Sequence, residues 1–216
     1  MRVLSIETPA HGRVLIKDPV TPSSPRVIVG FHGYAQSAED MLSELELIPG
    51  SDQWTLVSIQ ALHRFYAKGQ RVVASWMTSQ DRELAIKDNL AYVDRVIGTL
   101  VAPGTAGTPL VFVGFSQGVA MAYRSAVNGT HQAQCVIAVG GDVPPEVKLA
   151  PAARFPCVLV AGGNDDPWYT GAKLEADEEF LRSIGVKVDV FRYRGAHEWT
   201  PGLRDRVRQF LEDVVD

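Results

Sequence analysis

The chain has 216 residues, of which 46% are hydrophobic and 21% are charged. This balance is typical of a globular protein with one sizeable core. The net charge of −4 argues against nucleic acid or an anionic membrane as a main partner. No apolar run reaches the ~20 residues of a membrane span, and charges and a proline come too early for a signal peptide. We therefore expect a cytoplasmic protein with no stable membrane association.

The first half of the chain alternates strand-like and helix-like segments. Residues 1–7 and 11–17 alternate in polarity, which predicts a leading antiparallel hairpin that turns at Ala10–Gly12. Ser37 is the expected N-cap of a helix, with Asp40 in its acidic first turn. In chain order, the other predicted elements are a loop at 21–25, a buried strand at 26–33, a helix at 37–48, a strand at 54–61, an irregular segment at 64–80 and an amphipathic helix at 81–100.

The second half continues this alternation. Its predicted elements are a strand from 110, a helix from 119, strands at 134–141 and 156–163, a helix at 171–185, a strand at 186–195 and a helix at 201–215. Alternating strands and helices predict an α/β fold whose mainly parallel sheet has helices on both faces. With no linker or repeat in view, we expect a single domain over residues 1–216.

A serine between two glycines joins the strand at 110 to the helix at 119. The sequence Gly114-Phe115-Ser116-Gln117-Gly118 has the pattern G-x-S-x-G. In this strand–turn–helix setting the pattern predicts a nucleophile elbow, which exposes the serine hydroxyl at the strand end. The two glycines have no Cβ, so strand and helix can pack closely there. Ser116 is therefore the expected nucleophile.

Partners for this serine follow two later strands. Asp165 and Asp166 come directly after the strand at 156–163, and His197 follows the last strand. The order Ser, Asp, His is that of α/β-hydrolases, in which histidine takes the serine proton and aspartate orients the histidine. We favour Asp166 and keep Asp165 as the alternative. Three other histidines do not follow these strand ends and are less favoured as the base: His11, His63 and His131.

A serine hydrolase also needs two backbone N–H groups to bind the oxyanion. One is expected from the residue after the nucleophile, Gln117, and the other from a loop after an earlier strand. The sequence His32-Gly33-Tyr34 follows the strongest early strand, so we expect Tyr34 to supply the second N–H. His32 is expected to organise this loop rather than to react.

The motifs resemble, in order, those of the phospholipase/carboxylesterase family of small α/β-hydrolases. The matching stretches are GFHGYAQSAEDM, SWM, GFSQGVAMAY, GGNDDPW and GAHEW. The resemblance runs from about residue 26 to the C-terminus. It implies a serine esterase without a large lid domain and without a cofactor, with the aspartate before proline, Asp166, in the triad. It also implies that Trp76 lies near the mouth of the active site, where it either binds substrate as part of the cleft wall or is a structural aromatic.

The chain departs from the family after the Asp-Pro pair, where Trp168 and Tyr169 stand. Two aromatic residues beside the triad favour small or medium esters over lipidated proteins, and Trp168 is a candidate substrate-binding residue. The alternatives are a thioesterase or lysophospholipase on the same triad, or a non-catalytic binding protein. Exposed aromatics in 64–77 are compatible with a homodimer.

The two cysteines and the histidines show no spacing typical of metal ligands, so we expect neither a metal nor a cofactor. Cys135 and Cys157 each lie at or near the start of a predicted strand. Free buried thiols are the expected state in a cytoplasmic protein, and an inter-strand disulfide is the alternative.

Overall fold

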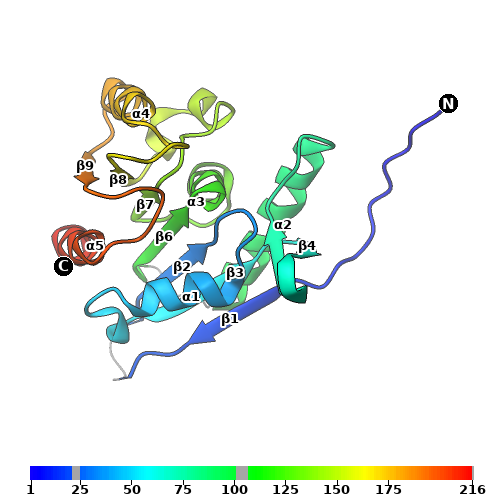
Figure 1. Ribbon diagram of the computed structural model, residues 1–216, viewed down its shortest axis with the longest axis horizontal. Coiled ribbons are helices and arrows are strands. Elements are labelled where there is room, and N and C mark those ends of the chain that lie inside the picture. The colour runs from blue at the N-terminus through cyan, green and yellow to red at the C-terminus, as the bar shows by residue number, and fades with distance from the viewer. Residues whose placement is uncertain (21–24, 101–106, 216) are drawn as a thin grey trace.

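A central sheet of seven strands organises the computed structural model, which describes residues 1–20, 25–100 and 107–215 (Figure 1). The strand order is β1-β3-β2-β6-β7-β8-β9. β1 runs antiparallel to β3, and all other neighbouring pairs are parallel. The predicted, mainly parallel sheet is thus confirmed. The strands are β1 (Arg13–Lys17), β2 (Val27–Phe31), β3 (Thr55–Gln60), β6 (Leu110–Phe115), β7 (Cys135–Val139), β8 (Cys157–Gly163) and β9 (Val188–Tyr193).

Helices cover both faces of this sheet, as predicted. Alternate side chains of a strand point to opposite faces, and in β2 Val29 packs in the cluster with α2, α3 and α4, while Ile28 packs with α1 and α5. The helices are α1 (Ala38–Glu46), α2 (Arg82–Leu100), α3 (Gln117–Asn128), α4 (Gly171–Ser183) and α5 (Pro201–Val215). Short 3₁₀ turns lie at Ser51–Gln53, Lys68–Gln70, Val147–Leu149 and Ala152–Arg154. None of the described helices is long and apolar enough to cross a membrane.

The predicted N-terminal hairpin is wrong. Residues 1–12 have no regular secondary structure, and the chain toward Met1 extends away from the body of the protein (Figure 1). β1 forms as expected, but it pairs with β3 and not with the segment before it. Alternation predicts a strand but not its partner, and the edge of a buried strand such as β3 offers more hydrogen bonds and apolar contact than a free tail. The predicted loop at 21–25 falls almost wholly outside the described residues.

The segment predicted as irregular at 64–80 contains a second small sheet. β4 (His63–Tyr66) pairs antiparallel with β5 (Val72–Ser75). Gly69, with φ of 74°, makes the turn between them. β5 is well buried, whereas β4 is mostly exposed. The residues of β4 therefore show no clear alternation of apolar and polar side chains, and the sequence lacks the signal of a strand pair. This hairpin also contacts the loop after β2.

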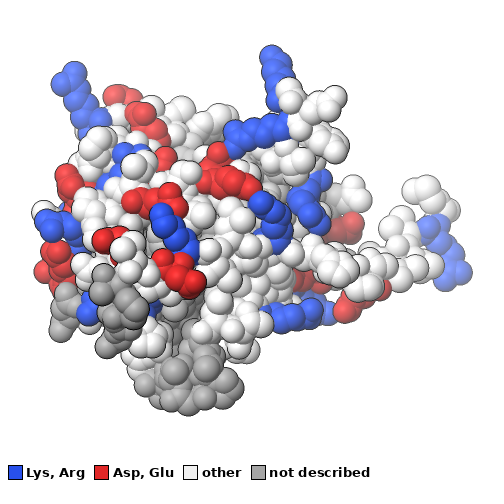
Figure 2. Space-filling view, turned by 90° about the horizontal axis from the view of Figure 1, so that it is seen from below, with Lys and Arg blue, Asp and Glu red and all other residues white. Residues whose placement is uncertain are grey.

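The mixed surface charge and the free thiols agree with what the composition predicts. Acidic and basic side chains are interspersed over the face drawn in Figure 2, and neither sign forms a continuous patch there. Both cysteines are free; Cys135 is buried and Cys157 is half-buried, in register on neighbouring strands.

Helix α3 approaches strand β2 so closely that its second residue has no space for a side chain. A Cβ at Gly118 would lie 2.0 Å from the carbonyl oxygen of Phe31, and one at Gly114 would lie 2.5 Å from Cα of Val119. Real Cβ atoms do not approach backbone atoms this closely. The two glycines of the G-x-S-x-G pattern therefore permit the packing of α3 on the sheet.

We expect Gly118→Ala to lower the unfolding free energy by about 3 kcal/mol or more, because the clash is with backbone and cannot be relieved by a rotamer change. The matched control is Gly202→Ala, at the second residue of α5, where a Cβ meets nothing within 4 Å. That substitution should be neutral or stabilise by about 0.5 kcal/mol. Urea unfolding of the two variants measures both effects. Similar stabilities for both variants would contradict the close packing.

Candidate active site

The site forms where the strand order changes direction. The chain leads from β2 to its neighbour β3 on one side and from β6 to its neighbour β7 on the other, so the loops after β2 and β6 diverge at the carboxyl edge of the sheet. Ligand sites of α/β sheets form in such crevices. A Cβ at Gly33, just after β2, would lie 3.3 Å from Cβ of Ser116, just after β6. The loop after β2 therefore touches the predicted nucleophile.

Ser116 occupies a strained turn. Its backbone has φ of 53° and ψ of −120°, and a positive φ is unfavourable for a residue with a Cβ. The turn is held because its N–H donates to the carbonyl of Val139, at 2.9 Å, and helix α3 begins at the next residue. The half-buried serine thus lies at the N-terminus of a helix, whose dipole favours negative charge.

His197 and Asp166 meet at the ends of the later strands. Nδ1 of His197 lies 2.7 Å from Oδ2 of Asp166. The other carboxylate oxygen accepts the N–H groups of Trp168 and Tyr169, at 2.8 and 2.9 Å. The carboxylate is fully buried, so these three bonds fix its orientation. Asp165 is exposed and lies outside this arrangement.

Two adjacent glycines bring the three predicted residues around one point. A Cβ at Gly140 would lie 3.1 Å from Cε1 of His197, and one at Gly141 would lie 2.5 Å from the carbonyl oxygen of Ser116. The ring of Phe115, the neighbour of Ser116, also packs against the His197 ring, with centroids 4.9 Å apart. The paired glycines after β7 therefore leave room for the imidazole beside the elbow.

The other histidines lie elsewhere. His11 and His63 are exposed, in the N-terminal tail and in β4. Nε2 of His131 contacts the backbone carbonyl of Asp94, at 3.2 Å.

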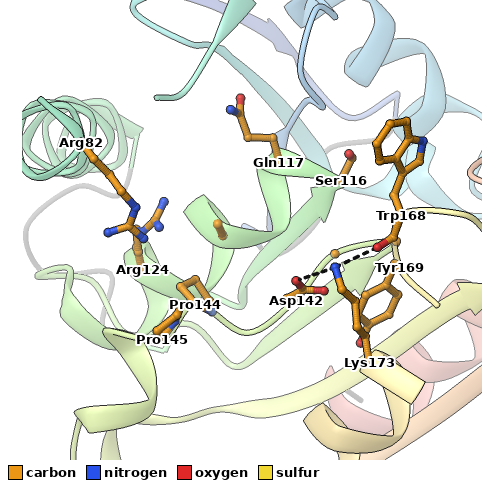
Figure 3. Close-up of a pocket in the computed structure, with 13 residues that line it drawn as sticks. Arg82, Ser116, Gln117, Arg124, Asp142, Pro144, Pro145, Trp168, Tyr169 and Lys173 are labelled. Carbon is orange, nitrogen blue, oxygen red and sulfur yellow. Dashed lines mark hydrogen bonds and ion pairs between the residues drawn. The ribbon is translucent and has the colours of Figure 1, made fainter. Parts of the chain in front are cut away.

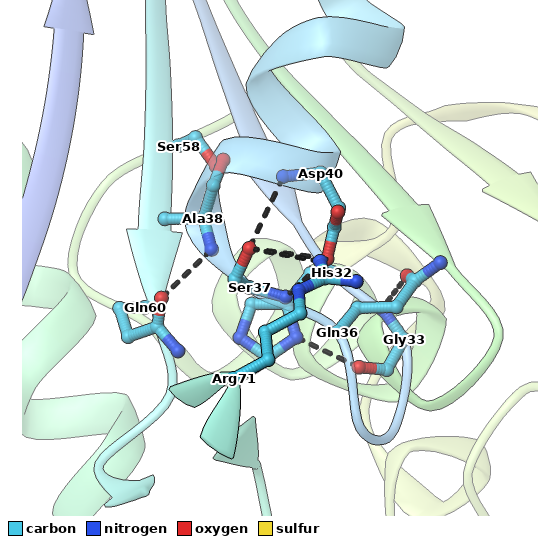
Figure 4. Close-up of polar contacts among 9 residues, drawn as sticks. All are labelled: His32, Gly33, Gln36, Ser37, Ala38, Asp40, Ser58, Gln60 and Arg71. Atoms are coloured by element: carbon cyan, nitrogen blue, oxygen red, sulfur yellow. Dashed lines mark hydrogen bonds and ion pairs between the residues drawn. The ribbon is translucent and has the colours of Figure 1, made fainter. Parts of the chain in front are cut away.

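His32 organises the loop that follows β2 (Figure 4). Its ring is buried, and Nδ1 lies 2.7 Å from the carbonyl of Gly33, while Nε2 accepts the N–H of Ala61 at 3.1 Å. Nε2 is therefore an acceptor and Nδ1 carries the proton. The side chain of Gln36 accepts the N–H of Gly33 at 2.7 Å, which closes the turn before Ser37 caps α1 together with Asp40. This network fixes the loop whose Gly33 lies against Ser116.

The β4–β5 hairpin and the residue after it form hydrogen bonds beside both predicted oxyanion donors. Its Ala74 exchanges backbone hydrogen bonds with Ala35 and Gln36, beside Tyr34, at 3.1 and 2.9 Å. On the other side, Oε1 of Gln117 accepts the N–H of Trp76 at 2.9 Å. The Gln117 side chain thus points to the hairpin. The backbone N–H of Gln117 lies in the first turn of α3, where N–H groups have no partner within the helix.

The two predicted substrate-binding tryptophans have different surroundings. Trp76 is completely buried, and its indole N–H donates to the carbonyl of His32 at 2.8 Å. The expectation that Trp76 lines the cleft is therefore not met: its fully buried indole supports the His32 loop. Trp168 is 70% exposed and lines a cavity beside Ser116.

This cavity has a volume of about 310 Å³ and extends from Ser116 and Trp168 to a charged end (Figure 3). The charged lining residues are Arg82, Arg124, Asp142 and Lys173. Lys173 donates to Asp142 at 3.2 Å and to the carbonyl of Trp168 at 2.9 Å. Sequence analysis missed all four residues. One signal was available: Arg124 lies two turns after Ser116 in an otherwise apolar helix segment.

At the charged end, one carboxylate serves two arginines. Glu146 accepts Nε of Arg124 at 2.7 Å with Oε1 and Nη2 of Arg82 at 2.8 Å with Oε2. Burial raises the pKa of Glu146, but the hydrogen bonds from Arg82 and Arg124 outweigh it and hold that pKa below its ordinary value. Burial is the main cause that lowers the pKa of Arg124, yet a guanidinium stays charged in proteins.

The sheet, the elbow at a strand end and the helices on both faces define the α/β-hydrolase class. The family model for phospholipases and carboxylesterases matches residues 14–215. The chain therefore belongs to the phospholipase/carboxylesterase family, as its motifs indicated, and is a hydrolase. No curated protein matched in a sequence search.

Solved structures support the fold. Esterase PE8 has a TM-score of 0.77 and 22% identity, over 95% of this chain and 100% of that one. Acyl-protein thioesterase 2 of Zea mays has a TM-score of 0.77 and 20% identity, with the same coverage of 95% and 100%. A carboxylesterase of Bacillus cereus has a TM-score of 0.75 and 15% identity over 95% of each chain. At these identities the likeness concerns the fold alone.

The buried His32 predicts a pH dependence of stability. Burial lowers its pKa below the ordinary 6.5, against the opposing effects of Gly33 and Asp40. Because the unfolded chain takes up this proton at higher pH than the folded one, the unfolding free energy falls as pH drops below about 6.5. The slope for this group is at most about 1.4 kcal/mol per pH unit.

We expect His32→Gln to reduce this slope, and His11→Gln, a change of the same type in the exposed tail, to leave it unchanged. Urea unfolding between about pH 5 and pH 7.5 measures the slope for each variant. If the slope of unfolding free energy against pH is the same in His32→Gln as in the wild type, the protonation of His32 is not linked to unfolding.

Proposed function

We propose that this protein hydrolyses carboxylic esters with small to medium acyl groups, through an acyl-enzyme formed on Ser116. The observation that carries the proposal is the contact of His197 with the fully buried, hydrogen-bonded carboxylate of Asp166, beside a serine on a strained elbow. A turn of this kind with no catalytic use would be an unexplained cost in stability.

In the proposed mechanism, Asp166 accepts a hydrogen bond from Nδ1–H of His197, so that Nε2 is free to act as base. Nε2 takes the Ser116 proton while Oγ attacks the ester carbonyl. The backbone N–H groups of Tyr34 and Gln117 bind the oxyanion. The imidazolium then protonates the leaving alkoxide, and the acyl group stays on Ser116. In the second half of the reaction, water takes the place of the serine hydroxyl: His197 accepts its proton, the water oxygen attacks the acyl-enzyme, and the acid is released as Ser116 regains its proton.

The cavity supports the size of the substrate. A volume of about 310 Å³ is at the low end for small-molecule sites. Tyr169 is buried in its wall, and Trp168 lies exposed beside it, so the two aromatics after Asp-Pro limit the space. Thioesters react through the same acyl-enzyme, and a matched ester and thioester pair measures which of the two is preferred.

The direct test is hydrolysis of p-nitrophenyl esters, from acetate to palmitate, by the wild-type protein and by Ser116→Ala. We expect turnover of the shorter esters by the wild type and a loss of about 10⁶-fold in kcat in the variant. Circular dichroism should show the same fold in both. Retained turnover in a folded Ser116→Ala protein would contradict the proposal.

The adjacent aspartates provide a matched pair of variants. We expect Asp166→Asn to lower kcat by about 10⁴-fold, because an amide no longer holds the required tautomer of His197. Asp165→Asn makes the same chemical change at an exposed position one residue away and should alter kcat by less than about 3-fold. Equal effects of the two substitutions on ester turnover would exclude the proposed role of Asp166.

A further inference from the structure

The cavity beside Ser116 has an excess of positive charge. Three cations, Arg82, Arg124 and Lys173, line it. Asp142 neutralises Lys173, and Glu146 is shared by the two arginines. These residues together leave one positive charge unmatched. The excess is local, since the whole chain has a net charge of −4.

Arg124 is placed where an unmatched charge is costly. Its side chain is 1% exposed, and helix α3 holds it two turns from Ser116. Nε and Nη2 bond to Glu146, at 2.7 and 2.6 Å. Within the described part of the chain, the contacts of Nη1 are the sulfur atoms of Met77 and Met121, each at 3.9 Å. A thioether is a weak acceptor, so a buried guanidinium nitrogen lacks a strong one.

Arg82 provides a second, more accessible donor at the same end. It lies at the start of α2, and its side chain is 39% exposed. In Figure 3 its guanidinium lies next to that of Arg124, at the end of the cavity opposite Ser116 and Trp168. Two guanidinium groups with one shared carboxylate favour an added oxyanion, because they bind carboxylate and phosphate through charge-assisted hydrogen bonds.

From these contacts we infer that the cavity selects esters that carry a second, anionic group, a carboxylate or a phosphate, which binds to Arg82 and Arg124 while the ester carbonyl lies at Ser116. This inference rests on the proposed esterase function and adds its substrate class. The anion is remote from the reacting carbonyl and is unchanged by the reaction. Its binding energy therefore contributes to substrate binding and orientation, and chiefly lowers KM.

The test compares pairs of esters that differ in charge and by one methyl group. The acyl-side series consists of mono-p-nitrophenyl esters of succinic, glutaric and adipic acids, and the neutral counterparts have the free carboxylate methylated. The leaving-group series compares butanoate esters of para-hydroxybenzoate and of its methyl ester. For at least one pair, the wild type should show about tenfold higher kcat/KM on the anionic ester. The series in which this occurs tells which side of the ester carries the anion.

Arg82→Gln should remove this preference by raising KM for the anionic ester about tenfold, with a change below about threefold on the neutral ester. Arg95→Gln is the matched control, because it removes the same charge from an exposed position on the same helix, and it should keep the preference. A wild type that hydrolyses neutral and anionic esters equally, or a preference that survives in Arg82→Gln, would overturn the inference and leave the esterase proposal standing.

A binding measurement separates the two proposals if no ester is hydrolysed. Isothermal titration of monoethyl glutarate into Ser116→Ala should give a dissociation constant about tenfold lower than in Ser116→Ala/Arg82→Gln. That result with no turnover would support the anion site and overturn the esterase. Equal affinity in the two variants would overturn the anion site.

Discussion

The carbonyl oxygen of Phe31 lies where a side chain at position 118 would have to be, and the rest of the site depends on this close approach of α3 to β2. It places the first turn of α3 against the loop that follows β2. Ser116 is consequently forced into a positive φ, next to Gly33 and above a helix N-terminus. The strain at this residue is compensated by the surrounding sheet and helix packing.

The remaining parts of the site are fixed from two sides of this elbow. Gly140 and Gly141 leave the space in which His197 meets the elbow. On the opposite side, the β4–β5 hairpin bonds both to the loop after β2 and to the side chain of Gln117. A small hairpin outside the main sheet thus couples the positions of the two proposed oxyanion donors, and packing alone would hold them less accurately.

Much of the fold was predictable because its signals are local. Apolar runs bounded by glycines mark the buried strands, and Ser116, Asp166 and His197 each follow such a run directly. Parallel strands bring their carboxyl ends to one edge, so the order of strands was enough to expect these residues together. The sequence favoured Asp166 over Asp165, and the structure adds the physical reason: adjacent residues of a turn point in different directions, and the Asp166 carboxylate contacts His197.

The features that the sequence did not reveal depend on contacts between distant segments. The first residues of the chain alternate in polarity like a strand, but β1 pairs with β3 and not with them. Trp76 gave no sign of its burial, which results from the loop that it supports. The bonds of Glu146 to Arg82 and Arg124 join the segment after β7 to two helices. No spacing rule predicts such a pairing, although a charged residue in the apolar helix α3 was a signal of it.

In the proposed mechanism, His197 and Asp166 make Ser116 a nucleophile. The most direct measurement is covalent labelling with a fluorophosphonate, followed by mass spectrometry of the intact protein and of its peptides. We expect one adduct per chain, on Ser116, that forms at least about 10³-fold more slowly in His197→Gln because the base is lost. An adduct on another residue, or equally fast labelling of Ser116 in His197→Gln, would contradict this mechanism.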